Sequence, residues 1–177
     1  HLNPRAAERV LIDGPAGTLE LAVNLPSVAT AGGPIGLALI AHPHPQQGGT
    51  LDNKVVQTLA KTFAAMGYAA LRFNFRGVGA SLGSFDEGNG ETDDALAALA
   101  YGRERFAGLP LALAGFSFGS FVQTRVAQRE AFERLVLVAP AVKRFAVPDV
   151  KADTIVVHGE EDDVAPHADV FEWARPP

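Results

Sequence analysis

Residues 110–119 read Pro110-Leu-Ala-Leu-Ala-Gly-Phe-Ser-Phe-Gly119, an apolar run that ends in a serine between two glycines. Short, near-continuous apolar runs of this kind are typical of strands that a parallel sheet buries on both faces. Residues 118–128 can form a helix, so the glycines mark a turn from strand into helix. In the pattern G-x-S-x-G such a turn strains the serine backbone and projects the hydroxyl outward. Glycine is needed on both sides because a side chain there would collide with the neighbouring strand or helix.

Similar patterns extend along the chain on both sides of this turn. Further buried strands are predicted at 36–41, 69–75, 134–139 and 154–157, and helices at 51–66, 91–106 and 166–174. Two β-like runs, 8–13 and 18–24, flank Gly14-Pro15-Ala16-Gly17 and predict a hairpin with a four-residue connection. Because parallel neighbours are joined by right-handed crossovers, the sequence predicts an α/β fold. We expect a three-layer α/β/α sandwich whose mostly parallel sheet carries an antiparallel N-terminal hairpin.

Length and composition exclude several classes of function. A chain of 177 residues predicts one domain, 1–177, and 47% apolar residues suffice for its core. The net charge is −5 and the basic residues are scattered, which argues against nucleic acid as a partner. The absence of cysteine excludes disulfides, thiolate zinc sites and cysteine nucleophiles and favours a cytoplasmic location. No apolar stretch reaches the length of about 18 residues that a membrane span needs, and no secretory signal is visible.

Ser117 is the first candidate for chemistry, because ligands in such folds bind beyond the carboxyl ends of the strands. The helix that follows would place its positive end and the Phe118 N–H near the hydroxyl, where they could stabilise an oxyanion. A glycine-rich turn with a helix-capping serine is the alternative.

An acidic cluster follows the strand at 154–157, and Asp162 is its candidate for orienting a catalytic histidine. The chain order of serine before acid agrees with this role. In the alternative, these carboxylates only solvate a loop ahead of Pro166 and favour a helix N-terminus.

The loop after the first buried strand reads His42-Pro43-His44-Pro45-Gln46-Gln47-Gly48-Gly49-Thr50. Two histidines make an incomplete zinc ligand set, so no metal site is predicted. A second oxyanion donor is the more economical role for this loop. The His44 N–H is the first choice and Gln46 or Gln47 the next, because proline has no N–H.

The stretch from Gly77 to Gly83 invites comparison with a dinucleotide-binding loop. The third glycine of G-x-G-x-x-G would fall at position 82, which is leucine, and no helix is expected directly behind the stretch. A nucleotide-binding domain is therefore the weakest of the interpretations.

Taken together, the Ser117 turn, His158-Gly159 before Asp162, the 42–50 loop and the run from Asn74 to Ser81 resemble the α/β-hydrolases. The chain resembles the compact, lidless bacterial serine hydrolases related to dienelactone hydrolase, over residues 8–174. The resemblance implies Ser117 as nucleophile, Asp162 as triad acid, and Phe118 with His44 as oxyanion hole. Dienelactone hydrolase itself employs a cysteine, which this chain lacks.

The family expects its catalytic histidine after the acid, beyond one further strand. Only 15 residues follow Asp162 (177 − 162), and their one histidine, His167, is expected at the surface beside Pro166. His158 precedes the acid and is interpreted as structural. The sequence therefore predicts a C-terminally incomplete chain that lacks its last strand, its last helix and the triad histidine.

The predicted function is hydrolysis of a small carboxylic ester or thioester through an acyl-enzyme intermediate, without metal or organic cofactor. Only 14 residues (140–153) separate two predicted strands at the place where larger relatives insert a cap domain, so none is expected. The partner is a small-molecule ester, and the sequence leaves a homodimer open. The alternative from another class is a catalytically silent hydrolase-fold protein that binds a small molecule or a partner.

Overall fold

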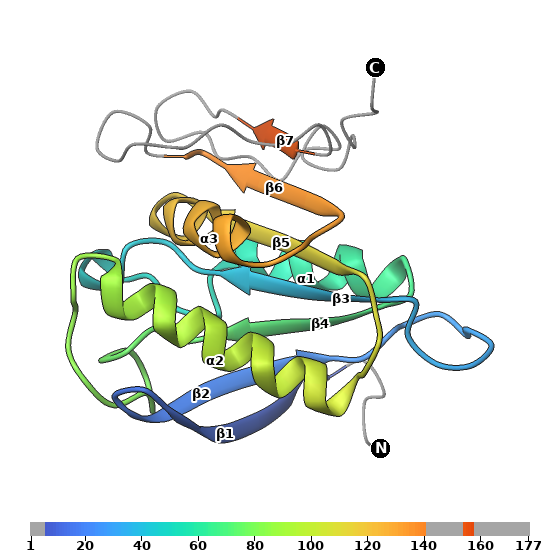
Figure 1. Ribbon diagram of the computed structural model, residues 1–177, viewed down its shortest axis with the longest axis horizontal. Helices are drawn as coiled ribbons and strands as arrows, with labels where there is room; N and C mark the ends of the chain where they lie inside the picture. Colours follow the sequence, from blue (N-terminus) through green and yellow to red (C-terminus); the bar gives the residue numbers. More distant parts are fainter. Residues whose placement is uncertain (1–5, 141–153, 158–177) are drawn as a thin grey trace.

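The computed structural model describes residues 6–140 and 154–157, and within them seven strands form one sheet in the order β1-β2-β4-β3-β5-β6-β7. Figure 1 shows the sheet with its helices. The strands are β1 (Glu8–Gly14), β2 (Gly17–Asn24), β3 (Gly36–Ala41), β4 (Tyr68–Phe73), β5 (Leu111–Phe116), β6 (Arg134–Val138) and β7 (Thr154–Val157). The helices are α1 (Lys54–Ala65), α2 (Asn89–Arg105) and α3 (Phe118–Arg129), with one 3₁₀ turn, η1 (Pro45–Gln47).

The sheet is antiparallel at one edge and parallel elsewhere. β1 pairs with β2 and β2 with β4 in antiparallel register, whereas β4, β3, β5, β6 and β7 run parallel. The N-terminal hairpin is confirmed, but its connection is shorter than predicted. Gly14 pairs with Gly17, so only Pro15 and Ala16 form the turn, because both glycines extend the ladder.

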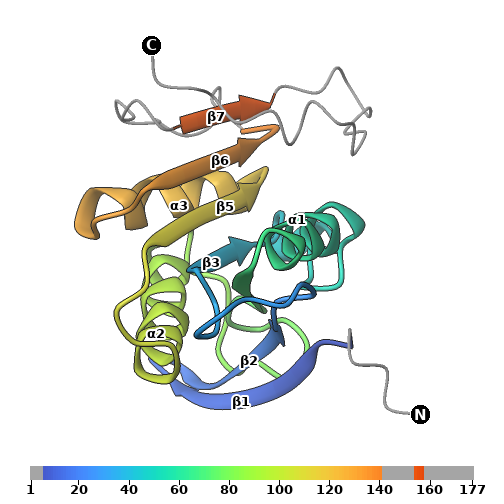
Figure 2. The same cartoon turned by 90° about the vertical axis from the view of Figure 1, so that its right-hand side faces the viewer.

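Helices cover both faces of the sheet, which confirms the three-layer sandwich. Figure 2 shows α1 on one side of the strands and α2 on the other. Under α1, Phe63 and Leu59 pack in one core cluster with Ile40 of β3. Under α2 and α3, a second cluster contains Leu39 of β3 and Phe73 of β4, because successive strand residues point to opposite faces.

Two predicted elements extend too far at one end, a helix by three residues and a strand by two, and hydrogen bonding explains both. The helix predicted from residue 51 begins at Lys54, because the Asn53 side chain accepts from the Val55 and Val56 N–H groups and caps it. The strand predicted to reach Phe75 ends at Phe73. Beyond it the Phe75 N–H donates to the His42 ring and not to a neighbouring strand.

The predicted helix 166–174, Asp162, His158 and His167 lie outside the described residues. Within 6–140 and 154–157, no helix is both long enough and apolar enough to cross a membrane.

Candidate active site

Ser117 lies at the junction of β5 and α3, at the carboxyl end of the strand. Its backbone has φ 55° and ψ −116°, a conformation that residues other than glycine rarely adopt. The residue is partly exposed. The strained turn predicted from G-x-S-x-G is therefore present, and strain of this kind is common where a protein holds a reactive group.

The two glycines of the turn have no room for side chains. A Cβ on Gly115 would overlap the Gly119 carbonyl and come within 2.6 Å of the Ser120 nitrogen, both in the first turn of α3. A Cβ on Gly119 would overlap the Ala41 carbonyl of β3 and lie 2.6 Å from the His42 carbonyl oxygen. The structure therefore confirms the predicted collisions, at Gly115 with the helix and at Gly119 with the strand.

Buried hydrogen bonds fix the turn to the sheet. The Ser117 N–H donates to the Val138 carbonyl of β6 at 2.8 Å. The buried Ser120 hydroxyl lies 2.8 Å from the Gly115 carbonyl oxygen and 3.1 Å from that of Val138. The Gln123 side-chain amide donates to the carbonyls of Leu39 and Ala114 at 2.9 and 3.0 Å. The first two turns of α3 are thus attached to β3, β5 and β6.

The Ser117 side chain does not cap the helix. Although Ser117 occupies the N-cap position of α3, its hydroxyl accepts no hydrogen bond from the first turn. A capping serine would use its oxygen in that way. The structure therefore contradicts the alternative of a capping serine and leaves the hydroxyl available for chemistry.

The structure brings His44 and Phe118 together. His44 precedes η1 in the loop after β3, and its ring centroid lies 5.1 Å from that of Phe118. The amides of Gln46 and Gln47, the other candidate donors, bond within the loop, to the His44 Nδ1 at 3.1 Å and the His44 carbonyl at 3.0 Å. The Gln46 and Gln47 amides are therefore engaged within the loop, whereas the His44 N–H has no hydrogen bond among the described residues.

His42 is a structural histidine. It is fully buried, its Nδ1 lies 2.7 Å from the Pro43 carbonyl oxygen, and its Nε2 accepts from the Phe75 N–H at 3.1 Å. Burial lowers the pKa of the imidazole to about 4, so the ring is neutral at pH 7. Both ring nitrogens are engaged, so His42 joins the loops after β3 and β4 and is not placed to accept a proton from Ser117. In the described part of the chain, no three His, Asp or Glu side chains are grouped to hold a metal ion.

Aromatic rings line the region between the two loops. The Phe85 centroid lies 4.9 Å from His44 and 5.7 Å from Phe118. Phe75 approaches Phe118 edge-on at 5.5 Å and is fully buried, whereas Phe85 is partly exposed. Phe85 therefore adds an apolar surface beside the side chains of His44 and Phe118, while Phe75 belongs to the core.

Two acidic side chains of α2 that were not predicted as functional residues hold the loop after β4 against this helix. Asp94 of α2 is almost fully buried and forms a two-point ion pair with Arg76, Nη2 to Oδ1 at 2.9 Å and Nε to Oδ2 at 3.1 Å. This carboxylate raises the pKa of the Arg76 guanidinium. Glu91 is fully buried and accepts from the N–H groups of Asp86 and Gly88 at 2.8 and 2.9 Å. Glu91 stands at the third helical position after Gly88, the place of the acid in a capping box, which is a signal that the sequence carries.

The stretch from Gly77 to Gly83 does not have the arrangement of a dinucleotide loop. The N–H groups of Gly77 and Ala80 donate to the Ser81 carbonyl at 3.1 Å and the Glu20 carboxylate at 3.0 Å. Such a loop would turn its amides to a phosphate, and α2 begins only at Asn89.

Comparisons with known proteins agree with this arrangement. The family model described as serine aminopeptidase, S33, matches residues 47–148. A crystal structure of a lidless α/β serine hydrolase from Xanthomonas campestris is similar, with TM-score 0.83 and 37% identity over 97% of this chain and 79% of that chain. An α/β serine hydrolase homologue from Coxiella burnetii gives TM-score 0.81 and 38% identity over 96% of this chain and 83% of that one.

A curated relative, an uncharacterized protein of Rickettsia prowazekii (strain Madrid E), is 37% identical over 136 residues, 76% of this chain. The matched part spans 56% of that relative's length. The family model covers more than half of this chain and includes Ser117 and both its glycines. The chain therefore belongs to the α/β-hydrolase superfamily, within the family described as serine aminopeptidase, S33.

Proposed function

We propose that the protein is a serine hydrolase that cleaves a small carboxylic ester or thioester through an acyl-enzyme intermediate. The observation that carries the proposal is the Ser117 turn, with its backbone at φ 55° and ψ −116° and a hydroxyl that does not cap α3. A structural serine would have no need of this strained conformation. Membership of a serine hydrolase family supports the same reaction class.

In the proposed reaction Ser117 Oγ attacks the substrate carbonyl carbon and its proton passes to a histidine. The carbonyl oxygen becomes an oxyanion, which accepts hydrogen bonds from the Phe118 and His44 N–H groups. The C–O or C–S bond then breaks, the histidine gives its proton to the leaving alcohol or thiol, and a serine ester remains. Water, deprotonated by the same histidine, attacks the carbonyl carbon of this ester. The bond to Ser117 Oγ then breaks, the histidine gives the proton to Oγ, and the carboxylic acid leaves.

The acid and base of the triad lie outside the described residues. We assign Asp162 as the carboxylate that orients the histidine and stabilises its charged form. Neither described histidine fits the role of base, because His42 has both nitrogens engaged and His44 Nδ1 accepts from the Gln46 N–H. The proton acceptor in this proposal is therefore a histidine outside residues 6–140 and 154–157.

An active-site-directed fluorophosphonate tests the nucleophile in the full-length protein. We expect one label on the wild type, none on Ser117→Ala, and full labelling of Ser84→Ala, a change at an exposed serine in the loop after β4. Hydrolysis of a p-nitrophenyl ester should fall roughly 10⁴-fold or more in Ser117→Ala. An amino-acid p-nitroanilide, the substrate that the family description suggests, should be cleaved far more slowly than the ester.

A folded wild type that takes up no label and hydrolyses neither substrate would remove the proposal. It would leave the silent hydrolase-fold binding protein as the better interpretation. Faster cleavage of the anilide than of the ester would keep Ser117 as nucleophile and replace esters by peptides as substrates.

A further inference from the structure

A concave site lies on the α1 side of the sheet. Its volume is about 660 Å³, within the usual range for small-molecule pockets. Polar residues from three elements line it: Asn24 and Ser27 at and after the end of β2, Gln57 and Lys61 on α1, and Arg72 on β4. Of the described residues proposed for catalysis, Ser117, Phe118 and His44, none lines this pocket.

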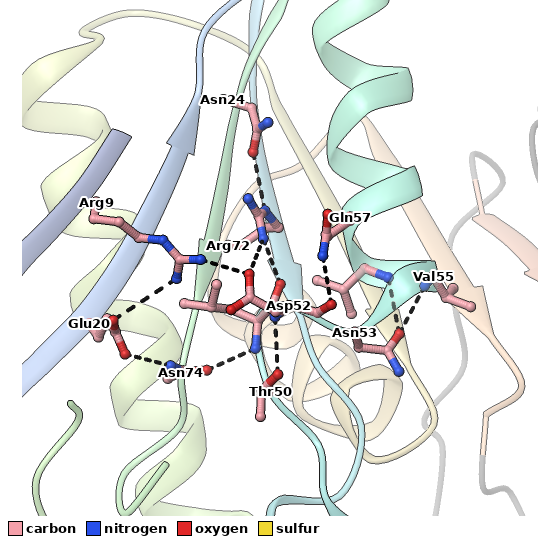
Figure 3. A network of polar contacts seen from close by, with 12 residues as sticks. Arg9, Glu20, Asn24, Thr50, Asp52, Asn53, Val55, Gln57, Arg72 and Asn74 are labelled. Carbon is pink, nitrogen blue, oxygen red and sulfur yellow. Dashed lines mark hydrogen bonds and ion pairs between the residues drawn. The ribbon is translucent and has the colours of Figure 1, made fainter. Parts of the chain in front are cut away.

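Arg72 contributes a buried guanidinium with one donor group unused. The residue is 4% exposed. Its Nε donates to Asn24 Oδ1 at 3.1 Å, and its Nη1 donates to the Leu51 carbonyl at 2.7 Å and lies 3.5 Å from Asp52 Oδ1 (Figure 3). Among the described residues no acceptor lies within hydrogen-bonding distance of Nη2. Among the described residues, the buried side-chain atoms without a partner are Gln123 Oε1 and Thr154 Oγ1. Arg72 Nη2 is therefore open to solvent at the pocket, where it can donate to an acceptor that enters.

Asn24 presents a second donor beside it. Its Oδ1 accepts from Arg72, which turns the amide nitrogen away from the guanidinium, as Figure 3 shows. Asn24 is 7% exposed, and within the described part of the chain its amide nitrogen has no hydrogen-bond partner. Arg72 and Asn24 are largely buried, and each thus offers one solvent-accessible N–H group at the same place.

The charge around the pocket is also positive. Lys61 lies one helical turn after Gln57 on α1 and is exposed, and no carboxylate is among the lining residues that the structure describes. The nearby Asp52 is engaged by Arg9 at 2.7 Å and by Arg72. Burial lowers the pKa of the Arg72 guanidinium and Asp52 opposes this, but arginine keeps its proton at neutral pH. Lys61 and Arg72 therefore both face the pocket, and none of its described lining residues is a carboxylate that would neutralise them.

We propose that this pocket binds a small organic anion. Its carboxylate or phosphate group accepts hydrogen bonds from Arg72 Nη2 and Asn24 Nδ2 and is attracted by Lys61. The volume greatly exceeds that of an inorganic anion, and apolar side chains complete the wall, so an organic part fits beside the charged group. These apolar residues are Ala6, Ala7, Leu25 and Ala64. Arg72 also holds Asn24, Leu51 and Asp52, but neither Arg72 Nη2 nor Asn24 Nδ2 takes part in those contacts.

Calorimetric titration of the full-length Ser117→Ala protein tests the proposal, because that variant removes turnover. The probes are hexanoate, hexyl phosphate, inorganic phosphate and, as the uncharged control, hexanol. We expect saturable binding of hexanoate or hexyl phosphate, and the tighter of the two identifies the charged group. Inorganic phosphate and hexanol should bind at least about ten-fold more weakly, because each lacks one half of the interaction.

Two further substitutions locate the site. Asn24→Asp keeps the oxygen that accepts from Arg72 Nε, so the variant should fold. It replaces the free NH₂ group by a second carboxylate oxygen, which repels an anion, so binding should be at least ten-fold weaker. Lys61→Gln should weaken binding roughly three- to ten-fold, while Lys54→Gln, the same change on the same helix outside the pocket, should stay within two-fold.

No saturable binding of either organic anion would overturn the proposal. Equal binding of hexanol and hexanoate, or unchanged affinity in Asn24→Asp, would also overturn it. The assignment of Ser117 would survive each of these results, because the labelling experiment does not involve this pocket.

Discussion

Gly119 packs against the main chain of Ala41 so closely that the two residues leave no space for a Cβ at position 119. Ala41 ends β3, and the next residues form the loop that carries His44. One contact therefore sets the distance between the Ser117 turn and the loop that supplies the second candidate oxyanion donor. Since the obstacles are carbonyl groups of the backbone, a side chain at 119 can be accommodated only if the turn or the loop moves.

Gly119→Ala should destabilise the fold and inactivate the protein. Overpacking against backbone costs roughly 1–3 kcal/mol, and the displacement acts directly on the proposed oxyanion donors. Urea unfolding measures the free energy, and fluorophosphonate labelling measures the reactivity of Ser117.

Gly108→Ala is the control, because a Cβ at 108 meets nothing within 4 Å although the residue has φ +75°. It should lose about 1–2 kcal/mol from the backbone alone and keep full labelling. Full labelling of Gly119→Ala at the wild-type rate would show that this contact does not position the site.

Local patterns predicted the parts of the fold that local physics determines. The strands β3, β5 and β6 are apolar because both faces are covered, and this character is visible in the sequence around Leu39, Leu113 and Leu137. The Ser117 turn was predictable for the same reason, since two glycines and a serine between a strand and a helix satisfy one local geometry.

Contacts between distant residues were not predictable in this way. Phe75 continues the apolar pattern of β4, yet its N–H bonds to His42, 33 positions earlier in the chain. Arg76 and Asp94 are 18 positions apart, and their pairing depends on how α2 packs. Periodicity reports which face a residue occupies and says nothing about which polar partner it meets there.

Glu91→Gln should loosen the loop that carries Phe85. Both oxygens of the buried Glu91 carboxylate accept backbone N–H groups, from Asp86 and Gly88, and glutamine offers one oxygen and a donor that opposes the second N–H. The expected loss is about 1–3 kcal/mol of unfolding free energy. Hydrogen exchange of the Asp86 and Gly88 amides should become faster.

Glu87→Gln makes the same chemical change at an exposed neighbour and should stay within about 0.5 kcal/mol of the wild type. If both variants lost the same free energy, the cause would be the loss of a charge and not the loss of an acceptor.

His42 should make the protein less stable in mild acid. The pKa of His42 is about 4 in the folded protein, whereas the ordinary value for histidine is 6.5, so the unfolded chain binds more protons between these two pH values. The neutral ring therefore makes its full contribution to the free energy of unfolding above pH 6.5, and this contribution is lost as the pH falls from 6.5 to 4. Over 2.5 pH units (6.5 − 4) it amounts to roughly 3 kcal/mol.

Urea unfolding of the wild type and His42→Gln between pH 7 and 4 isolates this effect, because the carboxylates titrate in both proteins. The wild type should lose its advantage over the variant as the pH falls. A difference in unfolding free energy that stays constant across this range would show that His42 is not held neutral by burial.

Phe85→Ala should lower the affinity for esters with an aromatic acyl group. The ring is partly exposed and packs beside His44 and Phe118, where the acyl chain of a substrate bound to Ser117 would lie in the proposed reaction. Loss of one aromatic contact is worth about 0.5–1.5 kcal/mol, so KM for a phenylacetate ester should rise roughly two- to twelve-fold. KM for the acetate ester should change less than two-fold, because acetate has no aromatic group to pack against the ring.

Leu82→Ala provides the comparison, since Leu82 belongs to the same loop and is 57% exposed. It should leave both esters unaffected. Phe85 also packs against the core, so its removal could act through the loop and not through the substrate. The two causes separate in the kinetics: a displaced loop lowers kcat for acetate and phenylacetate alike, whereas a lost contact raises KM for the aromatic ester alone. Equal losses on both esters would therefore assign Phe85 to support of the loop and remove it from the substrate site.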